Sequence, residues 1–495
     1  MAAIITEKFR QSNADAFSAD IASSKYYMFV GKSQPWTSEG ATSDSNPPTP
    51  VDSVAPESYY WDDMLAAKLI SSKSFVVPRR DWSATSAFDM YRHDIGNNAT
   101  GNYGTTKTTS SSGATNLFDS TFYFKTSTHN VYKVLYNGDH LQTGASNIGG
   151  SEPTNTGNAP FFNGSYLLKF MYTMSTTDVV NYLTTDFMPV TVNANRDANR
   201  GVYVFMVTSG GSGYPNGTFY TKLRGDGSGA IAKLVVSGTS IQVFGDATSK
   251  MEDNGSGYSF ATFDLAGTNI YTDTSASTLI SGGTLSTWNG ATAGTIKAII
   301  DPADGHGNDD IEELGGHYVM LQAKFEPTDA DAVQVNDFRR VGIVKNPIDS
   351  ATSSVSSLST ARTTNAILMA SGGSGAYQVD EKITQNSTGA QGRVVEWDAT
   401  NRILYYVQEK YSTYGLDTSG NLTLFSGANA VGGATSSASF TPVTTSGTTN
   451  GVVFASGYAN PELSRDTGEI IYVENRRAIS RASDQTEDIK VVVEF

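Results

Sequence analysis

The alternation of apolar and polar side chains is the feature that most constrains the fold of this chain. It is clearest over 317–325, where Val319, Leu321, Ala323 and Phe325 would share one side and the residues between them the other. A half-buried strand requires this period of two, whereas a helix needs apolar residues every three or four positions. Similar runs predict strands at 26–30, 130–136, 166–172, 202–208, 219–223, 230–236, 241–244, 260–265, 296–300, 338–344, 393–397, 403–408, 470–473 and 489–495.

Helical patterns are few and short. The best covers 58–71, where Trp61, Leu65 and Leu69 share one helical face and Ser58 can serve as N-cap. Weaker candidates cover 14–22 and 176–183, the second capped by Ser175 or Thr176. We therefore expect a mainly β protein, with a β-sandwich-like core and a few short helices packed on it.

Glycine is unevenly distributed along the chain. Residues 201–294 hold 17 of the 48 glycines, in phrases that begin at Gly210, Gly225 and Asn254 and alternate with strand-like runs. We interpret this window as an inserted β module with glycines at tight turns, where positive φ is free for glycine. A related pattern predicts a second β module over 366–450. The expected organisation is a discontinuous core formed by residues 1–200, 295–365 and 451–495, interrupted by these two modules.

Charge and cysteine content exclude several function classes. The net charge of −15 disfavours nucleic acid and anionic membrane surfaces as partners, because both attract basic proteins. The absence of cysteine excludes disulfide scaffolds and cysteine-ligated metals. The N-terminal residues lack the basic start and apolar run of a secretory signal, and no run approaches a membrane span, so we expect no cleaved signal and no membrane insertion.

The search for catalytic motifs returns none. Gly31-Lys32-Ser33 lacks the glycine that a phosphate-binding loop needs, because Tyr26 stands at that position. No Gly-Ser-Gly phrase has the spacing of a nucleophile elbow. His306 precedes Asp309 and Asp310 in a Gly-rich segment that we interpret as a polar turn rather than a metal site. We expect no catalytic residues, no cofactor and no metal.

Three arginine doublets are candidates for subunit contact. Against an acidic background, guanidinium groups can bind carboxylates of a partner chain in a bidentate manner, although intrachain ion pairs are the alternative. The doublets are Arg79-Arg80, Arg339-Arg340 and Arg476-Arg477. The last follows the strand predicted at 470–473, in a segment 474–477 that we interpret as a turn. We expect the C-terminal strand 489–495 to pair in the core sheet close to 470–473.

Several motifs, in order, resemble the baseplate wedge subunit family of T4-like contractile-tailed phages. They fall within roughly 1–195, 296–348 and 458–495 and include Tyr26–Ser33 with Pro35-Trp36, Pro47–Asp52, Val77–Trp82, Phe88-Asp89, Asn130–Lys133, Lys169–Ser175, Asp304–Gly307, Glu313–Gly316, Asp337–Ile343, Gly468–Arg477 and Asp484–Lys490. The two Gly-rich modules depart from the shorter members of the family as insertions.

The resemblance implies a structural virion protein in the tail baseplate, assembled in the host cytoplasm. It implies a homodimer that contacts other wedge subunits, helps transmit the baseplate change that triggers sheath contraction, and performs no catalysis. Two alternatives remain open. A receptor- or glycan-binding tail module would show an isolated aromatic groove, and a tail-associated hydrolase would show paired acids of perturbed pKa in a cleft.

Overall fold

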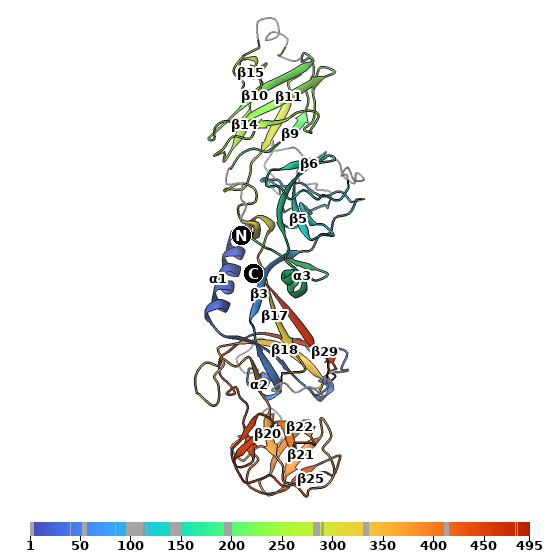
Figure 1. Ribbon diagram of the computed structural model, residues 1–495, viewed down its shortest axis with the longest axis vertical. Coiled ribbons are helices and arrows are strands. Elements are labelled where there is room, and N and C mark those ends of the chain that lie inside the picture. Colours follow the sequence, from blue (N-terminus) through green and yellow to red (C-terminus); the bar gives the residue numbers. More distant parts are fainter. Residues whose placement is uncertain are drawn as a thin grey trace. The chain divides into compact units, whose positions relative to one another are not determined.

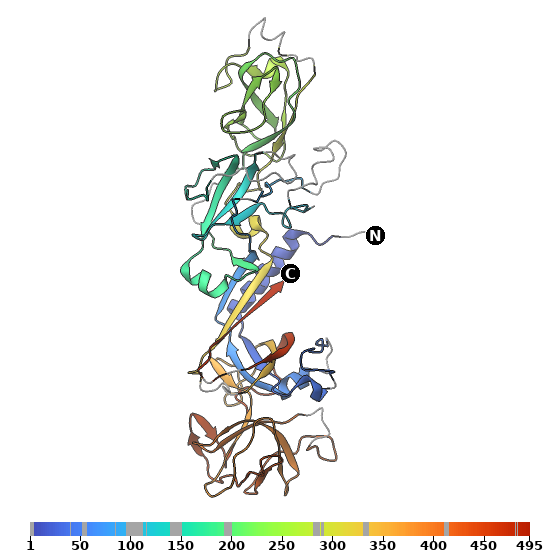
Figure 2. The same ribbon diagram turned by 90° about the vertical axis from the view of Figure 1, so that its right-hand side faces the viewer.

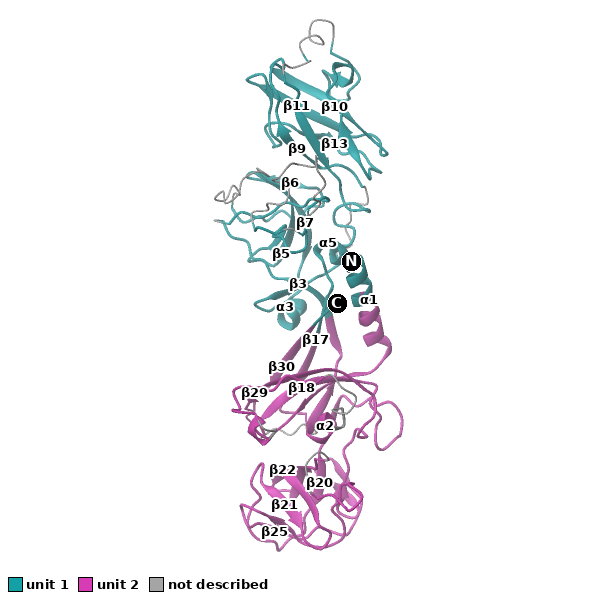
Figure 3. Cartoon of the chain, turned by 180° about the vertical axis from the view of Figure 1, so that it is seen from behind, with its two compact units in different colours: residues 1–14, 74–320, 493–495 teal, residues 15–73, 321–492 magenta. Residues whose placement is uncertain are grey.

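The computed structural model divides into two compact units, which Figure 3 colours separately. Unit 1 comprises Met1–Ala14, Ser74–Met320 and Val493–Phe495, and unit 2 comprises Asp15–Lys73 and Leu321–Val492. The structure describes residues 4–39, 41–51, 57–84, 86–95, 112–114, 116–138, 151–192, 200–280, 288, 292–329, 336–409, 415–480, 482 and 484–495.

Strands dominate both units, so the expected mainly β class is confirmed (Figure 1). Unit 1 contains a four-stranded sheet in the order β4-β5-β7-β6, formed by Tyr123–Lys125, Asn130–Asn137, Tyr166–Thr173 and Phe161–Asn163. It also contains β3 (Ser72–Pro78, of which Ser74 onward lies in this unit), paired antiparallel with β8 (Phe187–Pro189). The helices wholly within unit 1 include α3 (Thr176–Tyr182) and α5 (Asp310–Leu314), and a short 3-10 helix covers Gly267–Asn269.

A larger sheet in unit 1 gathers the Gly-rich window, coloured green to yellow in Figures 1 and 2. Its order is β12-β11-β10-β14-β16-β9, formed by Ser240–Ile241, Ile231–Ser237, Gly217–Gly225, Ala261–Phe263, Thr295–Ile299 and Val204–Ser209, with β13 (Lys250–Asp253) on β11 and β15 (Ile270–Tyr271) on β10. The glycine phrases meet one another, because Ser228 and Ser256 exchange backbone hydrogen bonds of 2.9 Å. Gly255 has φ +62, and a Cβ there would lie 2.4 Å from the Ser228 carbonyl oxygen.

Unit 2 contains two main sheets. One has the order β19-β2-β1-β18-β29, formed by Thr360–Arg362, Met64–Leu69, Tyr26–Gly31, Phe338–Lys345 and Glu469–Ile479. The other has the order β25-β24-β21-β22-β23-β20-β28, formed by Ser439–Phe440, Val431–Gly433, Lys382–Gln385, Ala390–Asp398, Ile403–Val407, Asn365–Leu368 and Tyr458–Ala459. The hairpin β26–β27 (Gly447–Thr449, Val452–Phe454), helix α2 (Glu57–Asp62) and a 3-10 helix (Trp36–Glu39) complete the described elements.

The chain passes between the units within four elements. They are α1 (Glu7–Ser23), β3, β17 (Tyr318–Phe325) and β30 (Glu487–Glu494). β17 lies where the alternation predicts a strand, but Met320 and Gln322 on its expected outer side are buried as well. The buried Gln322 amide donates to Asp488 Oδ1 on β30 at 2.7 Å, which satisfies a polar group that the alternation placed in water.

The helix predicted over 58–71 is wrong beyond its first turns. Helix α2 ends at Asp62, and β2 follows from Met64 as the neighbour of β1 and β19. A short apolar run fits a helix and a buried strand equally well. Here the segment is a strand because it pairs with β1 on one side and β19 on the other. The other two predictions hold: α1 contains 14–22, and α3 begins after Ser175, whose Oγ accepts from the Asp178 amide at 3.0 Å.

Two expectations about the C-terminal region are also wrong. Residues 474–477 form no turn but continue β29, where Glu474 pairs with Val341 of β18. The C-terminal strand β30 lies beside β17 rather than beside β29. Residues 474–477 stay in the strand because β29 pairs along the whole of β18, from Lys345 to Phe338, with two register shifts.

Candidate functional site

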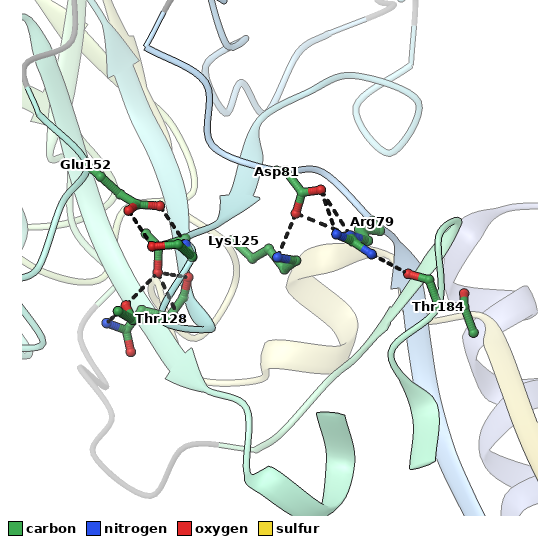
Figure 4. Close-up of polar contacts among 9 residues, drawn as sticks. Arg79, Asp81, Lys125, Thr128, Glu152 and Thr184 are labelled. Atoms are coloured by element: carbon green, nitrogen blue, oxygen red, sulfur yellow. Dashed lines mark hydrogen bonds and ion pairs between the residues drawn. The ribbon is translucent and has the colours of Figure 1, made fainter. Parts of the chain in front are cut away.

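Arg79 is held by a shared carboxylate at the end of β3. Its Nε lies 3.0 Å from Asp81 Oδ2, and its Nη1 donates to the Thr184 carbonyl at 2.8 Å (Figure 4). Lys125 Nζ lies 2.7 Å from the other oxygen of Asp81. Partial burial would raise the pKa of Asp81, but the two cations outweigh it and lower that pKa. Asp81 is therefore an ionised, doubly paired carboxylate.

Arg80 is half-buried in the same unit. Its guanidinium lies 4.3 Å from the centre of the Tyr123 ring, and Nη2 donates to the Phe118 carbonyl at 3.2 Å. A cation over an aromatic face is stabilised when water is excluded. Arg80 therefore packs within unit 1 rather than projecting freely.

Arg339 and Arg340 are both buried in intrachain ion pairs, which was the alternative that the sequence left open. Arg339 is 6% exposed, with Nε 3.0 Å from Asp44 Oδ1, and its Nη1 donates to the Ser33 carbonyl. Arg340 is 5% exposed, with Nη1 2.7 Å from Asp63 Oδ2. Their guanidinium groups balance carboxylates of their own chain, so this doublet offers no free partner-binding surface.

Arg476 and Arg477 are exposed on β29, the last strand in its sheet's order. Arg476 is 43% exposed and pairs with Glu474 at 3.2 Å. Its carbonyl accepts from Trp36 Nε1 at 2.7 Å, and Arg477 Nε donates to the Ser45 carbonyl at 3.0 Å. The Trp36 bond thus holds the backbone at Arg476, the Ser45 bond holds the Arg477 side chain, and both arginines remain exposed. Arg339-Arg340 and Arg476-Arg477 lie on the paired strands β18 and β29 of unit 2, where Arg340 is opposite Asn475, and Arg79-Arg80 belongs to unit 1.

A buried charged cluster in unit 1 was only partly visible in the sequence. Lys133 of β5 and Glu313 of α5 are 0% and 4% exposed, with Nζ 2.6 Å from Oε2. The other Glu313 oxygen accepts from the Gly307 and Asn308 amides at 2.6 and 2.9 Å. The available signal was a lysine inside the apolar run 130–136, since a charge there needs a buried partner.

His306 joins this cluster. Its Nε2 lies 3.2 Å from Asp301 Oδ1, its Nδ1 lies 3.8 Å from Glu313 Oε2, and its ring meets Tyr91 edge-on at 4.9 Å. Burial would raise the pKa of Glu313, but Lys133 and His306 outweigh it and hold that pKa at about 2. A general acid needs a pKa near the working pH, so Glu313 serves as a fixed counter-charge instead.

Within the described ranges, no three side chains of His, Asp or Glu gather in a way that could hold a metal ion. No described helix is long and apolar enough to cross a membrane. The charged cluster therefore orders the segment 301–313 against β5, and the exposed arginines of β29 are the sequence candidates left for an external contact.

Comparison with known proteins gives two matches. Residues 3–203 match the family model described as Bacteriophage T4, Gp8, about two-fifths of the chain. The baseplate wedge protein gp8 of Enterobacteria phage T4 is 35% identical over 99 residues, which is 19% of this chain and 30% of that relative. The chain therefore spans less than a third of the length of the curated relative that it matches. The family match ends two residues after Gly201, where the Gly-rich window begins.

Proposed function

We propose that this chain is a baseplate wedge subunit of a contractile phage tail, because its residues 3–203 match the family model described as Bacteriophage T4, Gp8. It is a structural protein of the virion. It assembles as a homodimer, contacts other wedge subunits and helps transmit the baseplate change that triggers sheath contraction. The observation that carries the proposal is the family match, supported by the similarity to the T4 baseplate wedge protein.

The exposed arginines of β29 support a partner contact. Arg476 and Arg477 lie on a strand whose backbone is fixed by pairing with β18 and by the Trp36 hydrogen bond, so ordering their side chains against a partner costs less entropy than on a loose loop. A guanidinium binds a carboxylate through two parallel hydrogen bonds, and an acidic subunit provides many carboxylates. These two residues are therefore the proposed subunit contacts of the six arginine candidates.

Light scattering of the purified chain tests the homodimer, and the Arg476→Ala/Arg477→Ala double variant tests the contact. We expect a dimer for the parent chain and weaker association for the double variant with an unchanged thermal melt. Arg224→Ala, which removes an arginine 64% exposed in unit 1, is the matched control. An unchanged oligomer and normal wedge assembly for the double variant would remove these arginines from the proposal. A density map of the whole virion, with this chain located outside the baseplate, would refute the wedge assignment itself.

The absence of catalysis belongs to the same proposal. The T4 relative is a baseplate wedge protein, and the buried carboxylate of Glu313 is paired with Lys133. We expect no turnover of host polysaccharide by the purified chain and no stoichiometric zinc, manganese or iron by elemental analysis. Turnover that is abolished by changing one acidic pair would overturn this part.

A further inference from the structure

An aromatic groove lies within unit 1 between the family-matched residues and the Gly-rich window. Its volume is about 380 Å³, and its walls include Phe162 and Leu167 on one side and Tyr203, Phe244 and Met251 on the other. Phe244 is 4% exposed and forms ring contacts with Phe162 at 6.1 Å and Phe205 at 5.1 Å. Small-ligand sites favour such apolar concavities between modules, with volumes of roughly 300–1,000 Å³.

Three polar side chains line the same groove. Asp246 and Lys250 form an ion pair of 3.1 Å, and their side chains are 67% and 33% exposed. Asn254 has its backbone carbonyl bound by the Val202 amide at 2.9 Å. Among the described residues, nothing hydrogen-bonds the Asn254 side-chain amide. Its backbone is thus fixed while its amide donor and acceptor remain available.

We propose that this groove binds one neutral sugar ring. The charges of Asp246 and Lys250 cancel, which favours an uncharged ligand over a phosphate or an ammonium ion. The Asp246 carboxylate accepts hydrogen bonds, the Lys250 ammonium donates them, and the Asn254 amide does both. This set matches the neighbouring hydroxyl groups of a sugar, each of which donates and accepts. The partly exposed rings of Phe162 and Tyr203 supply an apolar wall for the C–H face of the sugar.

The site requires the inserted window. Most of the residues used here, from Tyr203 to Asn254, lie between Gly201 and Asp301, whereas Phe162 comes from β6 and Leu167 from β7. The proposal therefore assigns a ligand to the insertion and does not depend on the baseplate role of the family-matched residues.

Saturation-transfer NMR on the full chain tests the site with methyl α-glucopyranoside, methyl β-galactopyranoside and N-acetylglucosamine as probes. We expect at least one to bind with a dissociation constant on the order of 1 mM. Asn254→Ala and Asp246→Ala should each weaken binding roughly fivefold, the effect of one lost hydrogen bond. Glu252→Ala, which removes an exposed carboxylate outside the groove, and Phe260→Ala, which removes a ring 57% exposed, should leave binding unchanged.

Three results would overturn the proposal. The first is no saturation transfer to any of the three sugars, and the second is equal transfer in the groove variants and the controls. The third is that phosphate or N-acetyltyrosine amide binds at the same residues while the sugars do not. The last two probes would identify an anion or a peptide aromatic as the occupant. If Asn254→Ala lowers the thermal melt, the exposed Asp246→Ala variant decides, because breaking an exposed ion pair changes stability little.

Discussion

The amide of Gly201 donates to Asp301 Oδ2 at 3.1 Å, so two residues one hundred positions apart close the base of the Gly-rich window. The same junction is reinforced by the Ile300 amide, which donates to His93 Nδ1 at 3.1 Å. A comparable closure occurs around the second module, where the Arg362 amide donates to Glu462 Oε2 at 2.7 Å. An inserted module needs its two ends close together, because the chain segments that flank it can then be joined directly when the module is absent.

The first prediction concerns the boundary of the first Gly-rich module. That this module folds separately from the rest of the chain is still a prediction. Its sheet includes β16 at Thr295–Ile299, beyond residue 294, paired with β9. Deleting 202–300 removes both strands, whereas deleting 201–294 leaves β16 without its partner. We expect the 202–300 deletant to stay soluble and melt cooperatively, with some loss of stability because Phe244 no longer covers Tyr136 at 4.8 Å.

The 201–294 deletant is the matched comparison. It should melt at a lower temperature or aggregate, because an unpaired strand edge is exposed. Circular dichroism measures the melting temperature of each deletant, and size-exclusion chromatography measures its aggregation. Loss of cooperative folding in the 202–300 deletant would show that the window is part of one indivisible core.

The second prediction concerns the buried pair of Lys133 and Glu313. Glu313→Gln leaves the Lys133 ammonium without its counter-charge, and such losses cost about 3–5 kcal/mol of unfolding free energy. Denaturant unfolding at neutral pH measures the loss. Glu312→Gln, at a neighbouring residue 51% exposed, should change stability little.

The same pair predicts a pH dependence with a definite sign. The pKa of Glu313 is about 2 in the folded chain against an ordinary 4.5, so its contribution is fully present above about pH 4.5 and is lost as the pH falls toward 2. The difference in unfolding free energy between the parent and Glu313→Gln should therefore shrink across that window. A difference that stays constant down to pH 2 would contradict the lowered pKa.

The third prediction separates the two arginine doublets of unit 2. Arg340→Ala strands the buried carboxylate of Asp63 and also removes the cation from the Tyr60 ring, 4.8 Å away. We expect a loss of about 3–5 kcal/mol in unfolding free energy. Arg476→Ala, at an exposed pair, should cost less than about 1 kcal/mol. Equal losses for the two variants would refute the buried structural role of Arg340.

The fourth prediction concerns the C-terminal strand. Ile489 and Val491 are 7% and 4% exposed, and each buried side chain of this size contributes about 1.5–3 kcal/mol. Removing 489–495 should therefore cost several kcal/mol, comparable to the net stability of a domain. Val492→Ser, at a partly exposed position of the same strand, is the control. A truncated chain with an unchanged melt would show that β30 contributes nothing to the fold.

The sequence by itself determined what depends on neighbours along the chain. Apolar runs placed β5, β7 and β18 within a residue or two of their observed bounds, because strands that are buried on both faces are apolar over most of their length. The sequence offered Ser175 or Thr176 as the cap of α3, and Ser175 is the cap. The glycine phrases indicated tight turns, since positive φ at Gly211 and Gly255 is a local property of the backbone.

Only the tertiary structure decided what depends on partners far away in the chain. Met64–Leu69 is a strand because β1 and β19 pair with both its sides, although its local pattern equally suited a helix. Arg340 is buried because Asp63 lies 277 residues away in sequence and 2.7 Å away in space. Doublets of identical composition thus divide into buried and exposed ones, because burial and counter-charge come from packing between distant segments, which one-dimensional spacing does not encode.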